Sequence, residues 1–564
     1  MTAPSAARGA AGRTLALRTL QRTAFAAAIV LELQPAWAMG IATGSDDWQL
    51  RWDNTVKYSS AWRLKSADPA LLFSPNHDDG DRNFGKGLVS SRVDLFSELD
   101  LSDGGRRGLR LSAAAWYDAV YNRGNDNPGF PGGAFPNRLG AANRFAPATR
   151  DLHGRSAEML DAFVFGKVEL DGGASLSGRL GRHSLLWGES LFFGANAIAG
   201  GQQPVDAVKL LSVPGTPFKE AVRPVPQVSG QIQFDGGVSI GAYYQFRWVP
   251  TRAPAVGSYF SDVDVVVRGA EQLLLPAPLP AAPRGADREP PSSGQGGLQW
   301  RWRAAETDLG LYAVRFHAKT PQVVPIVGFV VPPPAAVVAP VGFRQVYHEG
   351  IVAFGASASR TFGDVNLAVE ASLRRNQDLA STRGVDASAV GGPPIDGDNP
   401  GYAIGRTAHL NVSMLANLPS TPLWREANLV GELAWNRVLR VTRNAAALDP
   451  NASRDGGALR LQIEPRYRQV LPGLDLAVPV GLGWSPKGSR SMALGPVPMP
   501  ANGHGELSIG VNGSYLDAWR FTLGWTHFYG QAAPLQIGSS FTDYSYAQTL
   551  KDRDFVSLSI QRSF

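Results

Sequence analysis

Residues 365–374 read VNLAVEASLR and alternate apolar with polar side chains. One face would carry only apolar residues, namely Val365, Leu367, Val369, Ala371 and Leu373. The other would carry Asn366, Ala368, Glu370, Ser372 and Arg374. Because successive side chains of a strand point to opposite faces, this period of two predicts a β-strand with one apolar and one polar face. The pattern recurs around residues 298–303, 459–464, 506–512 and 519–526. A soluble β-sandwich would show this alternation too, so the lengths of the connections between strands must distinguish it from a membrane barrel.

The gaps between the expected strands alternate between long and short along the chain. Long gaps fall near residues 65–90, 122–157, 189–224, 250–296, 319–343, 377–402, 441–457, 487–503 and 530–553. Outer-membrane barrels pair short periplasmic turns with longer outer loops, and sandwiches have no reason to do so. The sequence therefore predicts an all-β fold, a transmembrane antiparallel β-barrel of about 18 strands (16–20). An even strand number would place both termini on the periplasmic side.

The composition and the start of the chain agree with an exported barrel. Of 564 residues, 44% are hydrophobic and only 18% are charged, and there is no cysteine, which excludes disulfides and thiolate metal sites. Four arginines precede the apolar run from Ala24 to Leu31, and the cleavage-type site Ala36-Trp37-Ala38 follows it. Residues 1–38 are therefore predicted to be a signal peptide and residues 39–564 the barrel. The charge balance gives no sign of nucleic-acid binding. The expected location is the outer membrane of a Gram-negative bacterium.

The last strand carries an assembly signal. Val556, Leu558, Ile560 and the terminal Phe564 share one face of it. A final strand that ends in phenylalanine resembles the recognition strand of proteins inserted by the barrel assembly machinery. We therefore expect that machinery, and outer-membrane lipid, to be partners of this chain.

Several long runs resemble the proteobacterial family called domain of unknown function 1302. They are DDGDRNF (78–84), WYDAVYNRGNDN (116–127), TRDLHGRSAEMLDAFVFG (149–166), GRHSLLWGESLFFGANAIAGGQQPVDAVKLLSVPG (181–215) and GSYFSD (257–262). The resemblance implies an outer-membrane barrel. It also implies a periplasmic or outer-membrane lipoprotein-like partner, domain of unknown function 1329, and an inner-membrane resistance-nodulation-type exporter. No activity and no cofactor are implied.

The longest of these runs predicts a segment inside the barrel. Residues 189–224 are rich in apolar side chains that need burial, and a loop folded into the lumen would provide it. An outer loop packed as a cap is the alternative. The candidates for a plug or constriction are Trp187, Glu189, Phe192, Phe193, Asn196, Asp206 and Lys209.

The polar faces of the strands supply candidates for the lumen lining. They are Arg92, Asp94, Glu98, Asp100, Arg110, Glu370, Arg374, Glu432, Arg460, Glu464, Arg466 and Arg468. Their mixed signs give no ion selectivity, and salt bridges between neighbouring strands are the favoured interpretation. The apolar, proline-rich stretches within 250–296 and 319–343 are expected to be outer loops. They would pack on the barrel mouth, touch lipid or receive a hydrophobic ligand, and we favour the ligand.

No catalytic or metal site is predicted. Asp78, Asp79 and Asp81 have oxygen ligands suited to calcium, but they lack the spacing of an EF-hand, so a solvated loop is favoured. Gly188-Glu189-Ser190 begins like a nucleophile elbow, but Phe192 stands where its second glycine would be. The expected function is a channel, without chemistry, for a hydrophobic small molecule or lipid. The alternatives are an adaptor barrel in a lipid-export complex and an outer-membrane hydrolase.

Overall fold

The computed structural model describes residues 39–41, 44–45, 47–129, 137–212, 221–331, 334–397, 399–486, 502–536 and 543–564. The expected signal peptide therefore lies outside the described residues. No helix in the described part of the chain is long and apolar enough to cross a membrane.

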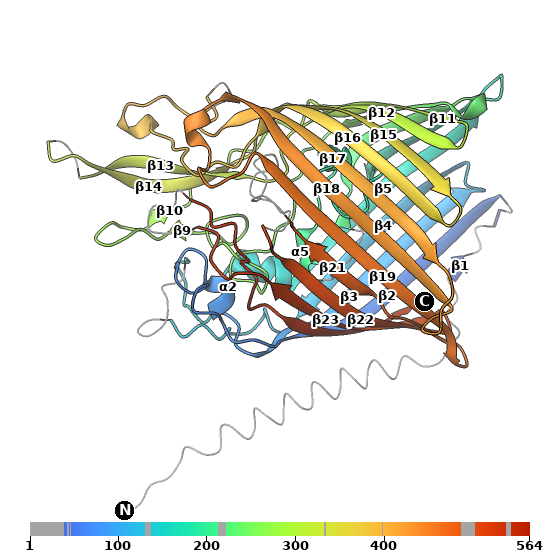
Figure 1. Ribbon diagram of the computed structural model, residues 1–564, viewed down its shortest axis with the longest axis horizontal. Helices are drawn as coiled ribbons and strands as arrows, with labels where there is room; N and C mark the ends of the chain where they lie inside the picture. The colour runs from blue at the N-terminus through green and yellow to red at the C-terminus, as the bar shows by residue number, and fades with distance from the viewer. Residues whose placement is uncertain are drawn as a thin grey trace, which may run out of the picture.

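One antiparallel sheet closes on itself to form a barrel (Figure 1). Its wall consists of β2 (Trp48–Arg63), β3 (Gly87–Asp103), β4 (Arg107–Asp118), β5 (Arg155–Glu169), β6 (Ser175–His183), β7 (Val225–Gln233), β8 (Ser239–Gln245), β11 (Gln295–Ala304), β12 (Thr307–Phe316), β15 (Ile351–Phe362), β16 (Val365–Asp378), β17 (Ile404–Leu418), β18 (Glu426–Arg443), β19 (Asp455–Leu471), β20 (Leu474–Ala477), β21 (Val480–Trp484), β22 (Gly505–Tyr515), β23 (Trp519–Tyr529) and β24 (Phe555–Ser563). β20 and β21 both pair with β19 and β22, so they are two halves of one interrupted strand and the wall has 18 strands. The predicted fold is confirmed.

The barrel closes between its first and last wall strands. β2 pairs with β24 from Thr55 to Arg63, and Asn54 and Phe564 exchange both backbone hydrogen bonds. The short β1 (Met39–Ile41) pairs with the beginning of β2 and adds nothing to the closure. Closure removes both sheet edges, so every wall strand has two partners.

The two ends of the barrel differ in their connections, as predicted. Turns of two to seven residues join the strands at one end, and connections of 11 to 49 residues join them at the other. The chain ends on the short-turn side, since Ser563 donates to Ala518 in one of these turns. We call the opposite end, with the long connections, the outer mouth.

The long connections carry the remaining elements. The short strands are β9 (Gln272–Leu273), β10 (Ala282–Pro283), β13 (Gln322–Val331) and β14 (Val337–Val346). The helical turns are α2 (Asp79–Arg82), α3 (Pro147–Thr149), η1 (Arg150–Gly154), α4 (Ala199–Gln202), α5 (Ala207–Ser212), η3 (Ser388–Val390) and η4 (Ala445–Ala447), while η2 (Asp235–Gly237) lies in a short turn. The β13–β14 hairpin projects beyond the barrel at the outer mouth (Figure 1).

Burial along the wall is the reverse of that in a soluble protein. On β16, Leu373 is 54% exposed whereas Glu370 is 2% exposed. The same face is apolar and exposed around the barrel, at residues that include Val93, Leu95, Val164, Leu180, Val228, Ile240, Leu298, Trp300, Leu311, Phe354, Val369, Leu433, Ile509, Leu523 and Ile560. Only a bilayer solvates such a belt at no cost, so the barrel spans a membrane.

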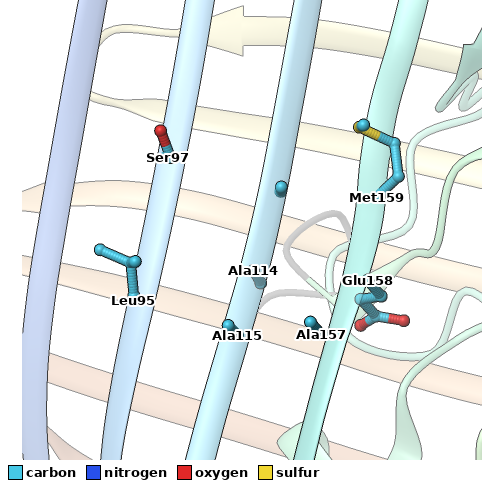
Figure 2. Close-up of a pocket in the computed structure, with 8 residues that line it drawn as sticks. Leu95, Ser97, Ala114, Ala115, Ala157, Glu158 and Met159 are labelled. Carbon is cyan, nitrogen blue, oxygen red and sulfur yellow. The ribbon is translucent and has the colours of Figure 1, made fainter.

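A hollow of about 310 Å³ lies in the outer wall across β3, β4 and β5 (Figure 2). Small side chains at Ala113, Ala115 and Ala157 form its floor between the larger Leu95 and Met159. The hollow is thus a consequence of side-chain size on the lipid-facing surface.

Apolar cores lie in the long connections and in the lumen. At the outer mouth, Phe84 packs edge-on against Tyr121 and Tyr259, which joins three connections in one cluster. Inside the barrel, Trp187 and Ile198 pack against a group of inward-facing wall residues that includes Tyr243 and Tyr312.

The apolar connections 250–296 and 319–343 contain more regular structure than expected. Residues within 319–343 were predicted to be a loop, but most of them form the β13–β14 hairpin. In an isolated two-stranded ribbon both strands are edges, so Pro325 and Pro340 are tolerated there. Leu273 and Ala282 of the 250–296 stretch are buried against Phe343 of β14. These residues pack on each other at the barrel mouth, and the binding of a hydrophobic ligand by these stretches stays a prediction.

Candidate functional site: a segment against the inner wall

Residues 185–203, which we call the inner segment, leave the wall after β6 and lie inside the barrel. Their described contacts run along the inward faces of β8, β11, β12 and β15 to β19. The segment has no alternating pattern and contains only one helical turn, α4, so its polar backbone needs partners from the wall. The predicted inserted segment is therefore present, and its first half lines one side of the bore.

Glu432 of β18 is the main acceptor for this backbone. Its Oε2 accepts from the backbone N–H of Leu191 (3.1 Å), Phe193 (2.9 Å) and Phe192, and its Oε1 accepts from Ser190 Oγ (2.7 Å). Asn411 Nδ2 of β17 donates to the same Oε1 at 2.7 Å. One buried carboxylate thus satisfies four donors of the inner segment.

Glu370 and Arg374 of β16 hold the two sides of the following turn. Glu370 accepts from the backbone N–H of Glu189 (2.7 Å) and of Ile198 (2.5 Å). Arg374 donates to the carbonyls of Ala195, Asn196 and Ala197 at 2.9–3.1 Å. Gly188 has a φ of +93°, and a Cβ there would lie 2.2 Å from Glu370 Oε2. This close approach requires glycine.

Asn196 is enclosed by amides and an imidazole from two strands. Its Nδ2 donates to Asn411 Oδ1 at 2.8 Å, and its Oδ1 accepts from Asn436 Nδ2 at 2.9 Å. His409 Nδ1 lies 3.0 Å from the same Oδ1, and its Nε2 lies 2.8 Å from Thr407 Oγ1. Each polar atom here has a partner, which fixes the segment to the wall rather than leaving groups free for a ligand.

The beginning of the inner segment is held by aromatic packing against the wall. Trp187 packs edge-on against Tyr243 of β8 and lies beside Tyr312 of β12. Its backbone N–H donates to Gln202 Oε1 (2.7 Å), and Gln245 of β8 donates to the carbonyl of Gln202 (2.5 Å). Five plug candidates, Trp187, Glu189, Phe192, Phe193 and Asn196, therefore lie in the inner segment.

The other two plug candidates lie beyond it. Asp206 pairs with Arg252 (2.9 Å), which also pairs with Glu158 of β5. Lys209 lies in α5, and its backbone N–H donates to Asp206 Oδ1 at 3.2 Å. Both therefore belong to the return of the chain toward β7 rather than to the part held by Glu370 and Glu432.

The other charged lumen candidates form ion pairs along or across strands. Of these, Arg460 also lies over the Phe192 ring of the inner segment and reaches past β21 to its partner on β22. The pairs are Arg92–Asp94, Arg110 with Glu98 and Asp100, Arg460–Glu506, Arg466–Glu464, and Arg468 with Glu426 and Asp475. Arg110 keeps 41% of its side chain exposed, in contrast to the buried Glu370 and Glu432. Arg468 is 59% exposed at the end of β19, so it lies at the rim.

The ion pairs of Arg110 lie near the short-turn end of β3 and β4 and stay partly exposed. Arg110, Glu98 and Asp100 belong to the part of the wall that the segment does not contact among the described residues. Farther along β4, Ser112, Trp116 and Asp118 are buried. The role of the inner segment as a plug or a constriction stays a prediction.

Sequence reasoning missed several residues that hold the segment. Asn411, Ser413, Asn436, Gln202 and Gln245 are uncharged, and nothing in their spacing distinguishes them from other polar wall residues. Ser190 Oγ donates to Glu432 and not to a histidine, so its elbow-like context has a structural explanation. The absence of catalysis stays a prediction.

The acidic group at the outer mouth was expected to be a solvated loop, and that was wrong. Asp78, Asp79 and Asp81 are all buried around α2. Asp81 pairs with Arg63 (3.2 Å) and with Arg553 (2.6 Å), which tie the connection to the two strands that close the barrel. Burial raises the pKa of Asp78 to about 7 and that of Asp79 to about 6. The connection folds inward because its aromatic neighbours pack into the cluster around Phe84.

Comparison with known proteins places the chain in a family without assigning an activity. In the solved structures, OccK2 (OpdF) of Pseudomonas aeruginosa is 11% identical, with 91% of this chain and 97% of that chain covered and a TM-score of 0.38. A BenF-like porin from Pseudomonas fluorescens Pf-5 is 10% identical (91% and 98% covered, TM-score 0.39), and OccAB1 of Acinetobacter baumannii is 9% identical (94% and 99%, TM-score 0.39). Similarity this low carries no argument about function.

No curated protein matches the chain. The sequence profile described as "Protein of unknown function (DUF1302)" matches residues 19–564, which is nearly the whole chain. The predicted resemblance is confirmed, and the chain belongs to the DUF1302 family.

Proposed function

We propose that this protein is an outer-membrane channel of a Gram-negative bacterium that admits a hydrophobic small molecule or lipid by binding and diffusion. The carrying observation is a segment inside a membrane-spanning barrel that Glu370, Arg374 and Glu432 fix to the wall. A barrel with only a structural role would need no such segment in its lumen. A lumen that carries charged ion pairs would also admit polar solutes, so the lumen alone does not set the substrate class.

The apolar hairpin at the outer mouth supports a hydrophobic substrate. Phe329 and Val331 of β13 and Val337, Val338 and Val341 of β14 are all exposed. The hairpin projects beyond the barrel, past the packed stretch around Phe343, so this apolar surface has no described partner of its own (Figure 1). Such a patch marks a contact site for apolar groups. It would collect a poorly soluble molecule above the entrance.

Uptake by proteoliposomes tests both parts of the proposal. We expect the protein to admit a fluorescent hydrophobic probe and small polar solutes, and Val331, Val337 and Val338 all changed to Ser to slow only the hydrophobic probe, by about tenfold. Leu139→Ser is the matched control, because Leu139 is exposed on another outer connection. No uptake of any solute would overturn the channel. Equal uptake of the hydrophobic probe by the triple variant would overturn the role of the hairpin.

The adaptor role is a second proposal, and exposed apolar residues in the short turns favour it. Leu423, Leu471 and Leu516 are each more than half exposed at the end of the barrel where the chain terminates. A periplasmic lipoprotein-like partner could bury them. If Leu423→Ser and Leu516→Ser abolish co-purification of such a partner from cells while proteoliposome uptake is unchanged, the adaptor role is supported. Unchanged co-purification would exclude these turns as the docking surface.

A further inference from the structure

Three buried carboxylates from two outer connections converge on one point. Asp78 directly precedes α2 and Asp79 is its first residue, in the connection between β2 and β3. Asp264 lies in the connection between β8 and β11. One oxygen of each lies within 4.8 Å of one oxygen of each of the others. All three residues are at most 1% exposed. Oxygens bound to one ion at 2.3–2.6 Å lie at most about 5 Å apart, so this spacing fits a shared cation.

The free oxygens, and not only the acidic composition, point to a ligand. Asp264 comes from a separate connection, is fully buried, and its Oδ1 has no hydrogen-bond partner. Its Oδ2 accepts from the backbone N–H of Asp79 at 3.1 Å, which fixes the carboxylate beside α2. Asp78 Oδ1 and Asp79 Oδ1 are likewise without a hydrogen-bond partner. Buried polar atoms left unpaired cost about 1–3 kcal/mol each, more for charged groups, so three of them in one place call for an explanation.

The surrounding charges leave a deficit of two positive charges. Arg82 Nε pairs with Asp78 Oδ2 at 2.7 Å. Arg138 is electrostatically coupled to Asp79, Asp264 and Glu271. Four carboxylates against two guanidiniums give a local charge of −2 when all are ionised. The nearby Arg63, Arg553, Asp81 and Asp552 form a separate group with balanced charge.

We propose that Asp78, Asp79 and Asp264 bind one hard divalent cation, with Ca²⁺ as the preferred ion, at the outer mouth. An all-oxygen donor set without histidine or cysteine suits Ca²⁺, and ligands from two irregular connections suit its variable coordination better than the strict octahedron of Mg²⁺. Water would complete the shell. The ion would clamp the 64–86 connection to the 246–294 connection and so hold the wall of the entrance in place.

Direct binding to the full chain is the test. The protein is refolded from inclusion bodies into a defined detergent, because lipopolysaccharide from cells would itself bind calcium. Isothermal titration with CaCl₂ after EDTA treatment should show one site per chain with a Kd of about 10⁻⁴–10⁻³ M, the range typical of extracellular sites. MgCl₂ should bind at least tenfold more weakly.

Two variants and a control locate the site. Asp264→Asn should weaken calcium binding at least tenfold, and Asp78→Asn provides a second readout if Asp264→Asn fails to refold. Glu289→Gln is the matched control, because Glu289 is an exposed acid on the same connection as Asp264 and should bind as the wild type does. The absence of calcium binding by the refolded wild-type chain would overturn the proposal. So would wild-type binding by Asp264→Asn or Asp78→Asn.

Discussion

Replacing Glu432 should release the inner segment. Its carboxylate accepts four hydrogen bonds from Ser190 and from the N–H groups of Leu191, Phe192 and Phe193. A hydrogen bond to a charged group contributes about 1.5–3 kcal/mol, so four give an upper bound of about 6–12 kcal/mol. Water in the bore can rehydrate the freed amides, and Glu370 and Arg374 still hold the segment. We therefore expect Glu432→Ala to destabilise the docked segment by about 2–4 kcal/mol.

The consequence is measurable as conductance. A loss of about 2–4 kcal/mol raises the population of the displaced segment about 30- to 700-fold, since 1.4 kcal/mol is a factor of ten. In planar bilayers, Glu432→Ala should show a larger mean conductance and frequent transitions to a wider state. Glu98→Ala is the matched control, because Glu98 also faces the bore but pairs with Arg110 and not with the segment. If a correctly folded Glu432→Ala variant has the conductance and the noise of the wild type, the segment does not set the width of the bore.

Three further outcomes are expected. Arg374→Met removes the donor to three carbonyls of the segment and should give a smaller rise in mean conductance than Glu432→Ala; a wild-type recording would contradict the role given to Arg374. Phe564→Ala should lower the fraction of heat-modifiable barrel in cells several-fold. The variant should still refold normally in detergent, because the backbone pairing with Asn54 remains. Equal assembly of the variant and the wild type in cells would refute the role of Phe564 as an assembly signal. Burial lowers the pKa of His153 to about 3, below its ordinary 6.5. The unfolded form therefore takes up the proton first as the pH drops. The free energy of unfolding should fall between about pH 6.5 and pH 3, by up to about 1.4 kcal/mol per pH unit. Hydrogen exchange at the Ala255 amide, which donates to His153 Nε2, should accelerate over that range after correction for the intrinsic rate, and His153→Gln should abolish the change.

The barrel was predictable because its physics is local. The alternation in β16 depends only on which side chains a bilayer or water can solvate, and the alternating connection lengths follow from strands that cross a membrane in turn. A segment inside the barrel was predictable at 189–224 for a similar reason, since its apolar side chains exceed what a free loop can expose, although the part held by the wall is 185–203.

The partners inside the barrel were not predictable, because they depend on contacts between distant parts of the chain. Glu432 and Ser190 are 242 positions apart, and the sequence contains no signal that pairs them. Asp264 meets Asp78 and Asp79 only after two long connections fold over the mouth. The hairpin at 322–346 was missed because its prolines argue against a strand, an argument that does not apply to a ribbon with two edges.

The orientation of the side chains on β16 tests the account most directly. The chain has no cysteine, so single cysteines at Leu367, Val369 and Leu373 and at Ala368 and Ser372 can be spin-labelled one at a time in bilayers. Labels at the first three positions should be accessible to oxygen and shielded from a water-soluble nickel complex, and labels at the other two should be shielded from lipid-dissolved oxygen. An accessibility profile without this period of two, or nickel access to the positions exposed on the outer face, would contradict a membrane-spanning barrel.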